Sequence, residues 1–449
     1  MAAMGKNFDL KDDPYYKLSK IDISRLQQEF WEVNETISEL SYLTHSYFRY
    51  YGKFPSKIGK MIIQDLDSRN LINSNEDFIV DNYAGSGTTL VEAKMCGFDA
   101  FGMDINPFAV LACKVKTRNY NVASLNNYWK KLQSEIVAYN QEMLYPNVQE
   151  LLFTSTTEDM KVQILKEVDE FKLMNKDAEK WFTPKALLGL AIIKSILLSR
   201  KADEERNFFE LAFFAIIRRV STAYDGEVRP HVNKKKRERN VLDAYSKKVF
   251  EMIELMDKWN QKTKPSVSSG AILCDNSNEK EVSNYLKFLK KETGKQLGLV
   301  VSHPPYLNCF DYIAVFKLKF MWAAGFDDIF FGYDYQQIKK MEIKSYPANS
   351  SANIANYFRH NEVIYKNVYN KLRIGGYCCI VIGDCTLQGE LFEVHKTFVS
   401  ILEDIGFVTD KIAYRSTSYG IGQYAYRHRA DYSENANRKK DGVLFFKKV

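Results

Sequence analysis

The fold is decided by residues 78–93, which read FIVDNYAGSGTTLVEA. The apolar run at the start has strand character, a glycine-rich turn follows it, and the residues after the turn favour a helix. A second apolar run, residues 100–103, ends in Asp104. This order of strand, glycine turn, helix and strand with a terminal acid is the layout of a βαβ nucleotide-binding unit. In such a unit the helix N-terminus supplies free N–H groups and the acid can bind a ribose.

The glycine pattern points away from a dinucleotide. Gly85 and Gly87 are present, but Leu90 stands where G-x-G-x-x-G requires a third glycine, and the lysine of a phosphate-binding P-loop is missing. A ligand with ribose and adenine but no pyrophosphate fits this pattern, and S-adenosylmethionine is such a ligand. The alternative is a purely structural turn. Asp81 before the turn and Asp104 after it favour the cofactor site.

Composition sets the broad class of protein. The chain has 449 residues, of which 45% are hydrophobic and 27% charged, as in ordinary soluble proteins with two or three domain-sized units. The polar N-terminus and the lack of a long apolar run predict a cytoplasmic protein without membrane contact. Seven scattered cysteines without a C-x-x-C pair predict reduced thiols and no metal site. The net charge of +7 permits a polyanionic partner without requiring one.

Short buried strands separated by helices predict a doubly wound, Rossmann-like α/β sheet with ligands at the carboxyl ends of its strands. Between residues 118 and 268 glycine is rare and long amphipathic segments recur, which predicts a large helical insertion. We therefore expect a polar, mostly helical lead-in (1–40) and a first part of the core with the cofactor motifs (41–117). The insertion (118–268) and a second part of the core with the catalytic loop (269–449) follow.

A second landmark follows the apolar run 297–301. It is the stretch Ser302-His303-Pro304-Pro305-Tyr306. Consecutive prolines fix φ, remove two N–H donors and leave rigid carbonyls pointing outward, which suits a substrate that presents an amino group. The neighbouring aromatic ring can stack on a base swung out of a helix. The alternative is a plain structural turn, but its place after a buried strand in a chain with a cofactor loop favours catalysis.

Together, residues 81–89 (DNYAGSGTT), 103–107 (MDINP) and 303–306 (HPPY) resemble the amino-group DNA methyltransferases, which use S-adenosylmethionine. That family carries D-x-F-x-G-x-G as its cofactor motif and D/N/S-P-P-Y/F/W as its catalytic tetrapeptide. Serine at the first position of the tetrapeptide is associated with N4-cytosine enzymes, and Asp or Asn with N6-adenine enzymes. The resemblance covers residues 40–118 and 270–449 and leaves the insertion outside.

Two positions depart from the family pattern. Tyr83 replaces the usual Phe, and its ring can still pack under the cofactor. His303 stands where the family has Asp, Asn or Ser, with Ser302 one residue earlier, which favours cytosine over adenine. A neutral imidazole has one acceptor nitrogen that can bind an amine proton, whereas a protonated imidazole has none. The alternative is that His303 marks a homologue with lost or changed activity.

The resemblance implies a set of site residues. Direct methyl transfer in this family needs neither a cysteine nucleophile nor a metal. The catalytic residues would be His303, Pro304, Pro305 and Tyr306, with the flipped base stacked on the tyrosine. The cofactor-binding residues would be Lys53, Phe54, Asp81, Tyr83, Ala84, Gly85, Gly87, Thr88, Asp104, Ile105, Asn106, Asp275 and Asn276.

Basic residues of the insertion and of the C-terminal region are candidates for contact with DNA phosphates. A run of charge is as compatible with a solvated loop as with a nucleic-acid contact. The candidates are Arg218, Arg219, Lys234, Lys235, Lys236, Arg237, Arg415, Tyr419 and Arg427.

We therefore expect a DNA methyltransferase that acts on an exocyclic amine, N4 of cytosine ahead of N6 of adenine, in a restriction-modification or defence setting. Its partners would be double-stranded DNA and a restriction endonuclease. Two alternatives remain. One is an RNA or tRNA base methyltransferase, which shares the cofactor fold, and the other is a catalytically silent homologue that binds nucleic acid.

Overall fold

A computed structural model of the chain describes residues 8–36, 38–144, 156–330, 333–416 and 440–449. Within them, an eight-stranded sheet has the order β1-β9-β10-β6-β5-β2-β3-β4. Strand β10 is antiparallel to β6 and β9, and the other neighbouring pairs are parallel. The strands are β1 (Gln27–Trp31), β2 (Asp77–Asp81), β3 (Ala100–Asp104), β4 (Ser269–Leu273), β5 (Gln296–Ser302), β6 (Tyr377–Gly383), β9 (Phe407–Ser416) and β10 (Lys440–Lys448).

Helices cover both faces of this sheet, because side chains along each strand alternate between two hydrophobic clusters. Phe78 and Val80 of β2 pack in one cluster and Ile79 in the other. The adjacent Cys378 and Cys379 of β6 divide in the same way. One cluster contains residues of α11 (Glu279–Thr293), α16 (Ser351–Lys371) and α17 (Val394–Ile405). The other contains residues of α2 (Ser56–Ser68), α3 (Thr88–Met95) and α4 (Pro107–Thr117).

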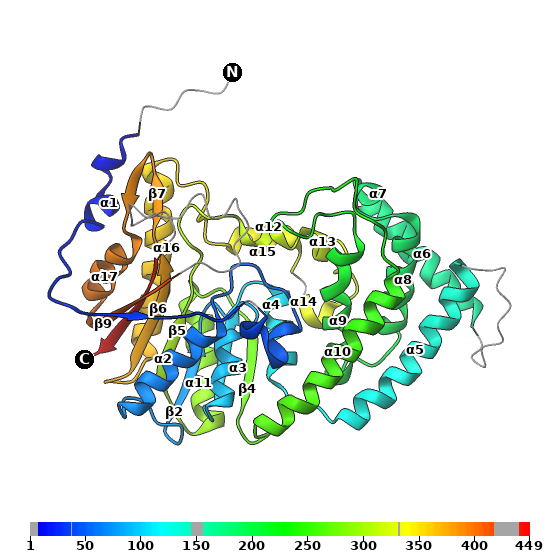
Figure 1. The fold of residues 1–449 in the computed structure, drawn as a ribbon, viewed down its shortest axis with the longest axis horizontal. Helices are drawn as coiled ribbons and strands as arrows, with labels where there is room; N and C mark the ends of the chain where they lie inside the picture. The colour runs from blue at the N-terminus through cyan, green and yellow to red at the C-terminus, as the bar shows by residue number, and fades with distance from the viewer. Residues whose placement is uncertain (1–7, 37, 145–155, 331–332, 417–439) are drawn as a thin grey trace.

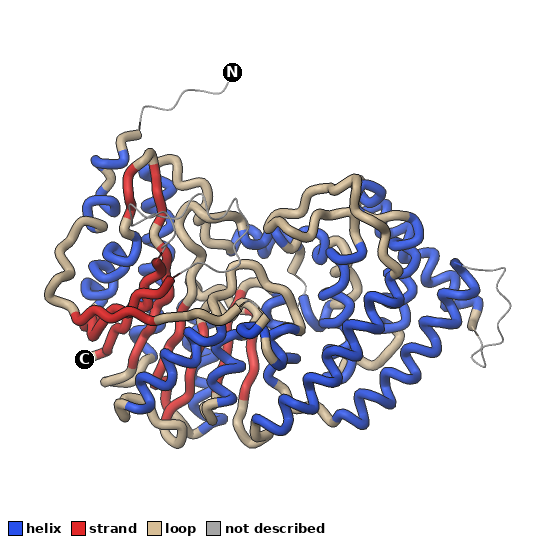
Figure 2. The backbone as a smooth tube through the Cα atoms, viewed as in Figure 1, coloured by secondary structure: helices blue, strands red, loops and turns tan. Residues whose placement is uncertain are grey.

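The region between residues 118 and 268 is helical where it is described, apart from loops and an isolated bridge between Ala223 and Val232. Its helices are grouped beside the sheet, at the side where β4 lies (Figure 1). Figure 2 shows the strands confined to the other part of the molecule. The helices are α5 (Val122–Leu144), α6 (Glu158–Met174), α7 (Ala178–Trp181), α8 (Pro184–Leu198), α9 (Glu204–Val220) and α10 (Val241–Lys262).

The insertion shares its core with the rest of the chain. Phe108 of α4 packs edge to face on Phe214 of α9, with ring centroids 4.9 Å apart. One hydrophobic cluster runs from α4 through the insertion to the segment that follows the Pro-Pro loop. That segment contains α12 (Tyr312–Val315), α13 (Lys317–Phe320), α14 (Asp327–Phe330) and α15 (Tyr335–Met341).

The N-terminal segment differs from the expected mostly helical lead-in. It begins with a 3₁₀ turn (η1, Leu10–Asp12) and a short helix (α1, Pro14–Leu18) but then forms β1, which pairs in parallel with β9 at the sheet edge. Of the five β1 residues only Trp31 is buried, so the strand has no apolar alternation to read in the sequence. Its partner lies near the other end of the chain, which local patterns cannot reveal. The remaining short elements are η2 (Glu39–Ser41), η3 (Leu43–Ser46), β7 (Cys385–Leu387) and β8 (Glu390–Phe392).

Candidate active site

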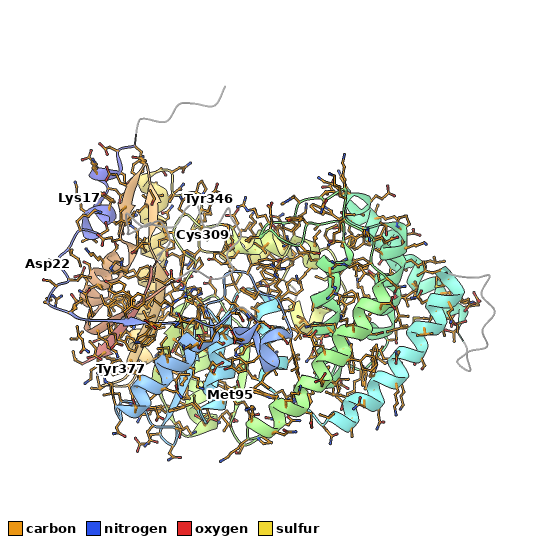
Figure 3. All side chains as sticks on the ribbon, in the orientation of Figure 1. Lys17, Asp22, Met95, Cys309, Tyr346 and Tyr377 are labelled. Atoms are coloured by element: carbon orange, nitrogen blue, oxygen red, sulfur yellow. The ribbon has the colours of Figure 1, made fainter. Side chains whose placement is uncertain are left out.

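The glycine turn and the Pro-Pro loop leave neighbouring strands at the same edge of the sheet. Strands β2 and β5 pair in parallel, with Asp81 opposite Val301. From this pair the chain continues outward in opposite directions, to β3 on one side and β6 on the other. Doubly wound sheets bind ligands at such a reversal, beyond the carboxyl ends of the strands. Figure 3 shows Cys309, which follows the Pro-Pro loop, at the opposite edge from Tyr377, where β6 begins.

The glycine turn depends on two residues with left-handed backbone. Gly85 has φ of +49° and Gly87 has φ of +74°. A side chain at Gly87 would place Cβ 3.0 Å from Sγ of Cys113. Gly87 is the N-cap of α3, so the turn lies against the unpaired N–H groups of that helix. The buried Lys116, which the sequence analysis did not single out, donates to the carbonyl of Ser86 and helps to hold the turn.

Asp104 joins the second strand of the unit to the glycine turn. Its Oδ2 accepts from the N–H of Gly85 and its Oδ1 from the N–H of Asn106, each at 2.8 Å. Burial raises the pKa of Asp104 to about 6, and these hydrogen bonds oppose the rise. Each carboxylate oxygen has a second lone pair, so the group can still accept from ligand hydroxyls.

A cavity lies between the glycine turn and the Pro-Pro loop. Its empty volume, including the part open to solvent, is about 850 Å³. Two predicted cofactor residues, Asp81 and Gly87, do not line it. The carboxylate of Asp81, whose pKa burial raises to about 7, accepts from the N–H of Tyr83 at 3.0 Å. The predicted residues that do line it are Lys53, Phe54, Tyr83, Ala84, Gly85, Thr88, Asp104, Ile105, Asn106, Asp275 and Asn276.

Ten further residues, which were not predicted from the sequence, also line this cavity. Some of them lie beside predicted residues in the same motifs, so the motif itself could have identified them. Others, from Tyr312 to Ile343, belong to the segment after the Pro-Pro loop, which carries no motif, and His360 and Ile364 belong to α16. The missed residues are Tyr50, Gly52, Ser86, Tyr312, Ile313, Met341, Glu342, Ile343, His360 and Ile364.

The Pro-Pro loop presents His303 to the cavity rather than Ser302. His303 and Pro305 line the cavity, whereas Pro304 does not. The fully buried Ser302 lies 2.7 Å, hydroxyl to hydroxyl, from Tyr365. The carbonyl of Pro305 already accepts from the hydroxyl of Tyr357 at 2.7 Å. The side chain available at the first position of the tetrapeptide is therefore an imidazole.

A second, larger cavity shares a wall with the first. Its empty volume, again including open solvent, is about 1970 Å³. His303 and Phe54 line both cavities, and their rings pack with centroids 5.1 Å apart. Tyr306 lines only the second cavity, with its ring centroid 5.1 Å from that of His303. The insertion reaches the same cavity through residues 226–228.

Three of the predicted DNA-contacting side chains are used inside the protein. The buried Arg218 donates to three backbone carbonyls of the loop that follows α9. Lys236 donates to the carbonyls of Arg218 and Ala223 at 2.9 and 2.7 Å. The buried Arg415 forms an ion pair with Asp441. These partners argue against a phosphate contact for the three side chains and give them a structural role instead.

The other candidates divide into two groups. Arg219, Lys234, Lys235 and Arg237 are exposed at the end of α9 and in the loop before α10. Tyr419 and Arg427 lie outside the described residues.

Within the described part of the chain, no helix is both long and apolar enough to cross a membrane. The same residues contain no group of three or more His, Cys, Asp or Glu side chains that could hold a metal ion.

The chain is similar in sequence to several known methyltransferases. The chain is 24% identical over 270 residues to the Type II methyltransferase M.MvaI of Kocuria varians, which covers 59% of this chain and 53% of that protein. It is 22% identical over 288 residues to the Type II methyltransferase M.BsoBI of Geobacillus stearothermophilus, covering 62% and 52%. A third match, 33% identical over 107 residues, is the Type II methyltransferase M.MjaII of Methanocaldococcus jannaschii, covering 24% and 17%. No family model matches.

A search of solved structures gives the rRNA methyltransferase aviRa from Streptomyces viridochromogenes at a TM-score of 0.32 and 8% identity, covering 92% of this chain and 94% of that one. The sheet itself is doubly wound and Rossmann-like, with β10 as the antiparallel strand. In sequence the chain resembles the Type II methyltransferases, and it spans about half the length of the first two of them.

Proposed function

We propose that this chain is an S-adenosylmethionine-dependent DNA methyltransferase that methylates the exocyclic amine of a base turned out of the duplex. The observation that carries the proposal is the wall of His303 and Phe54 shared by two cavities. The cofactor motifs line one cavity, and Tyr306, the predicted stacking partner of the base, lines the other. A cofactor and a base that occupy these two spaces would meet at the Pro-Pro loop.

The chemical groups around the first cavity suit S-adenosylmethionine. Asp104 can accept hydrogen bonds from ribose hydroxyls, and Asp275 and Asn276 can bind the adenine. Burial lowers the pKa of Lys53 and so disfavours its ammonium form. The carboxylate of a bound cofactor would offset this effect, because an opposite charge nearby stabilises the ammonium. Asp81 and Gly87, which do not line the cavity, act by shaping the glycine turn.

When bound, the cofactor supplies an electrophilic methyl group. The protein then has to present the target nitrogen with its lone pair available. The imidazole of His303 would accept an N–H of the target amine, while Tyr306 holds the base by stacking. Pro304, whose carbonyl the resemblance also assigns to the amine, lines neither of the two cavities. Alignment of this kind can contribute roughly 7–11 kcal/mol to lowering a barrier.

The direct test is isotopic methyl transfer from labelled S-adenosylmethionine, with genomic DNA and tRNA offered together. We expect label in the DNA. Label in the tRNA would instead identify an RNA base methyltransferase, and label in neither would identify a silent homologue.

For the target and setting we propose N4 of cytosine, on the resemblance of residues 302–306, and a restriction-modification pair with an endonuclease. Ser302 is turned toward Tyr365, so this preference would have to act through the shape of the second cavity. Nucleoside analysis of methylated DNA by mass spectrometry separates N4-methylcytosine from N6-methyladenine. Sequencing of the modified sites would then identify the endonuclease with the matching recognition sequence.

Replacing Asp104 by alanine should weaken cofactor binding by roughly 10- to 100-fold, because hydrogen bonds to a charged group contribute about 1.5–3 kcal/mol. The wild-type affinity should also depend on pH. The pKa of Asp104 is about 6, and ribose hydroxyls favour the ionised form, so affinity should fall as the pH drops below about 6. Calorimetry at several pH values measures both effects.

The matched control for this experiment is Asp99→Ala. Asp99 stands just before the other end of β3, where it accepts from the N–H of Ser268 and pairs with Lys295. Its loss should leave the cofactor affinity and its pH dependence unchanged. Equal weakening by the two substitutions would remove Asp104 from the binding site.

The exposed basic residues predict how DNA binding responds to salt. Neutralising Lys234 or Lys235 should lower the slope of log affinity against log salt by about one unit if that residue contacts a phosphate. Lys290 provides the control, because α11 ends where the chain turns into the amino end of β5, away from the site. Fluorescence anisotropy over a salt series gives the slopes. A slope that stays at the wild-type value assigns the tested lysine to bulk solvent.

A further inference from the structure

A chain of hydrogen bonds leads from the Pro-Pro loop to the last strand of the sheet. His303 Nε2 lies 3.1 Å from the hydroxyl of Tyr306, and that hydroxyl donates to Oδ2 of Asp441 at 3.0 Å. Arg415 of β9 pairs with the same carboxylate oxygen. Asp441 and Arg415 face each other across the register of β10 and β9. No motif in the sequence connects Asp441 with Tyr306.

The direction of these hydrogen bonds is fixed by the groups that form them. Asp441 is 0% exposed and lies beside a buried guanidinium, which stabilises its ionised form, and an ionised carboxylate can only accept. The phenol of Tyr306 has a single hydrogen, and Asp441 takes it. Toward His303 the phenol oxygen can therefore only accept, so Nε2 of His303 must carry the hydrogen.

In a neutral imidazole one nitrogen carries the hydrogen and the other the acceptor lone pair. With the hydrogen on Nε2, the lone pair is on Nδ1. Resting on the function proposed above, we propose that Arg415 and Asp441 act through the Tyr306 hydroxyl as positioning residues, which hold His303 in the Nε2–H tautomer so that Nδ1 accepts the amine hydrogen of the target base.

This arrangement gives a role to three features that the proposed function leaves unexplained. It explains a buried ion pair next to the substrate cavity, which is lined by Arg415. It explains how histidine can replace the acidic or polar residue of the family pattern, since a wrong tautomer would present a hydrogen instead of a lone pair. It also explains why Tyr306 needs a hydroxyl, which stacking alone does not require.

The test uses the full-length protein with ¹⁵N-labelled histidine rings. The chain has six histidines, and a His303→Gln sample identifies the resonances that belong to His303. In the wild type we expect Nδ1 to resonate as an unprotonated ring nitrogen and Nε2 as a protonated one. Tyr306→Phe removes the acceptor and should shift both resonances toward the average of the two tautomers.

Asp441→Asn offers a second variant with a directed outcome. An asparagine amide can donate to the phenol oxygen, which frees the phenol hydrogen for His303 and should move the ring toward the Nδ1–H tautomer. Because this variant leaves Arg415 without its partner, Tyr306→Phe is the variant to rely on if Asp441→Asn does not fold. In both variants we expect the kcat of methyl transfer to fall at least tenfold, while cofactor affinity stays at the wild-type value.

Asp384→Asn is the matched control, because it removes another buried carboxylate, one that pairs with His395 at 2.8 Å. It should leave the His303 resonances and kcat unchanged. A wild-type protein with hydrogen on Nδ1 would overturn the proposal, and so would a Tyr306→Phe variant that keeps the wild-type tautomer and kcat. If the wild type methylates no nucleic acid, the proposed function fails, whereas the tautomer measurement still decides whether this network sets His303.

Discussion

Alanine at position 303 should abolish methyl transfer, with at least a hundredfold loss in kcat, while cofactor binding stays nearly intact. His303 lies on the wall between the two cavities, and its imidazole is the acceptor we assign to the target amine. Groups that accept or hold a proton in a transition state typically contribute about 10²–10⁴-fold. The measurement pairs a methyl-transfer assay at saturating cofactor with calorimetry of cofactor binding.

Two further variants make this result specific. Tyr306→Ala should also abolish transfer without loss of cofactor affinity, because Tyr306 lines only the second cavity. His303→Asn replaces the acceptor nitrogen by an amide oxygen and should retain more activity than the alanine variant. Wild-type rates in both alanine variants would show that the Pro-Pro loop is not the catalytic loop.

The central βαβ unit could be predicted from sequence because its signals are local. The apolar run before Asp81, the two glycines and the carboxylate of Asp104 lie within one continuous stretch, and each has a physical requirement that few residue types meet. The structure makes this visible at Gly87, where φ is +74° and the neighbouring Cys113 leaves no room for a side chain. The run before the Pro-Pro loop is similarly clear, because β5 is buried on both faces.

Other parts of the site depend on contacts between distant residues. Asp441 lies 135 positions after Tyr306, and the antiparallel placement of β10 between β6 and β9 brings the two together. From the sequence, Arg415 was a candidate for contact with DNA, because no local pattern indicates that it pairs with the buried Asp441. Glu342 lines the first cavity, but it follows a short helix with no recognisable motif.

The insertion shows the same division within one segment. Its helices were predictable, because long apolar faces such as that of α9 have to pack against other helices. The roles of its basic residues were not, because a charge run does not reveal which members are exposed. Arg218 and Lys236 hold the loop that reaches the second cavity, and the exposed Lys234 and Lys235, just before Lys236, remain as candidates for DNA.

Gly383→Ala should lower kcat by roughly a hundredfold without touching any reacting atom. A Cβ at Gly383 would lie 2.6 Å from the ring of Tyr306 and 2.6 Å from Oδ1 of Asp441. Contacts this short cannot persist, so the ring or the carboxylate must move. A displacement of about 1 Å near reacting groups can cost about 10²-fold in rate, and overpacking of this kind costs about 1–3 kcal/mol of stability. Methyl-transfer kinetics and urea unfolding measure the two effects.

Gly270→Ala is the comparison that makes this prediction informative. Gly270 lies in β4 of the same sheet, and a Cβ there would meet no atom within 4 Å. That substitution should change stability by no more than about 0.5 kcal/mol and leave kcat unchanged. Cofactor affinity should stay at the wild-type level in both variants, because neither glycine lines the first cavity, which we assign to the cofactor. If Gly383→Ala also retains the wild-type kcat, the packing of Tyr306 against β6 and β10 does not control catalysis. That result would also contradict the proposal that Asp441 of β10 acts through Tyr306.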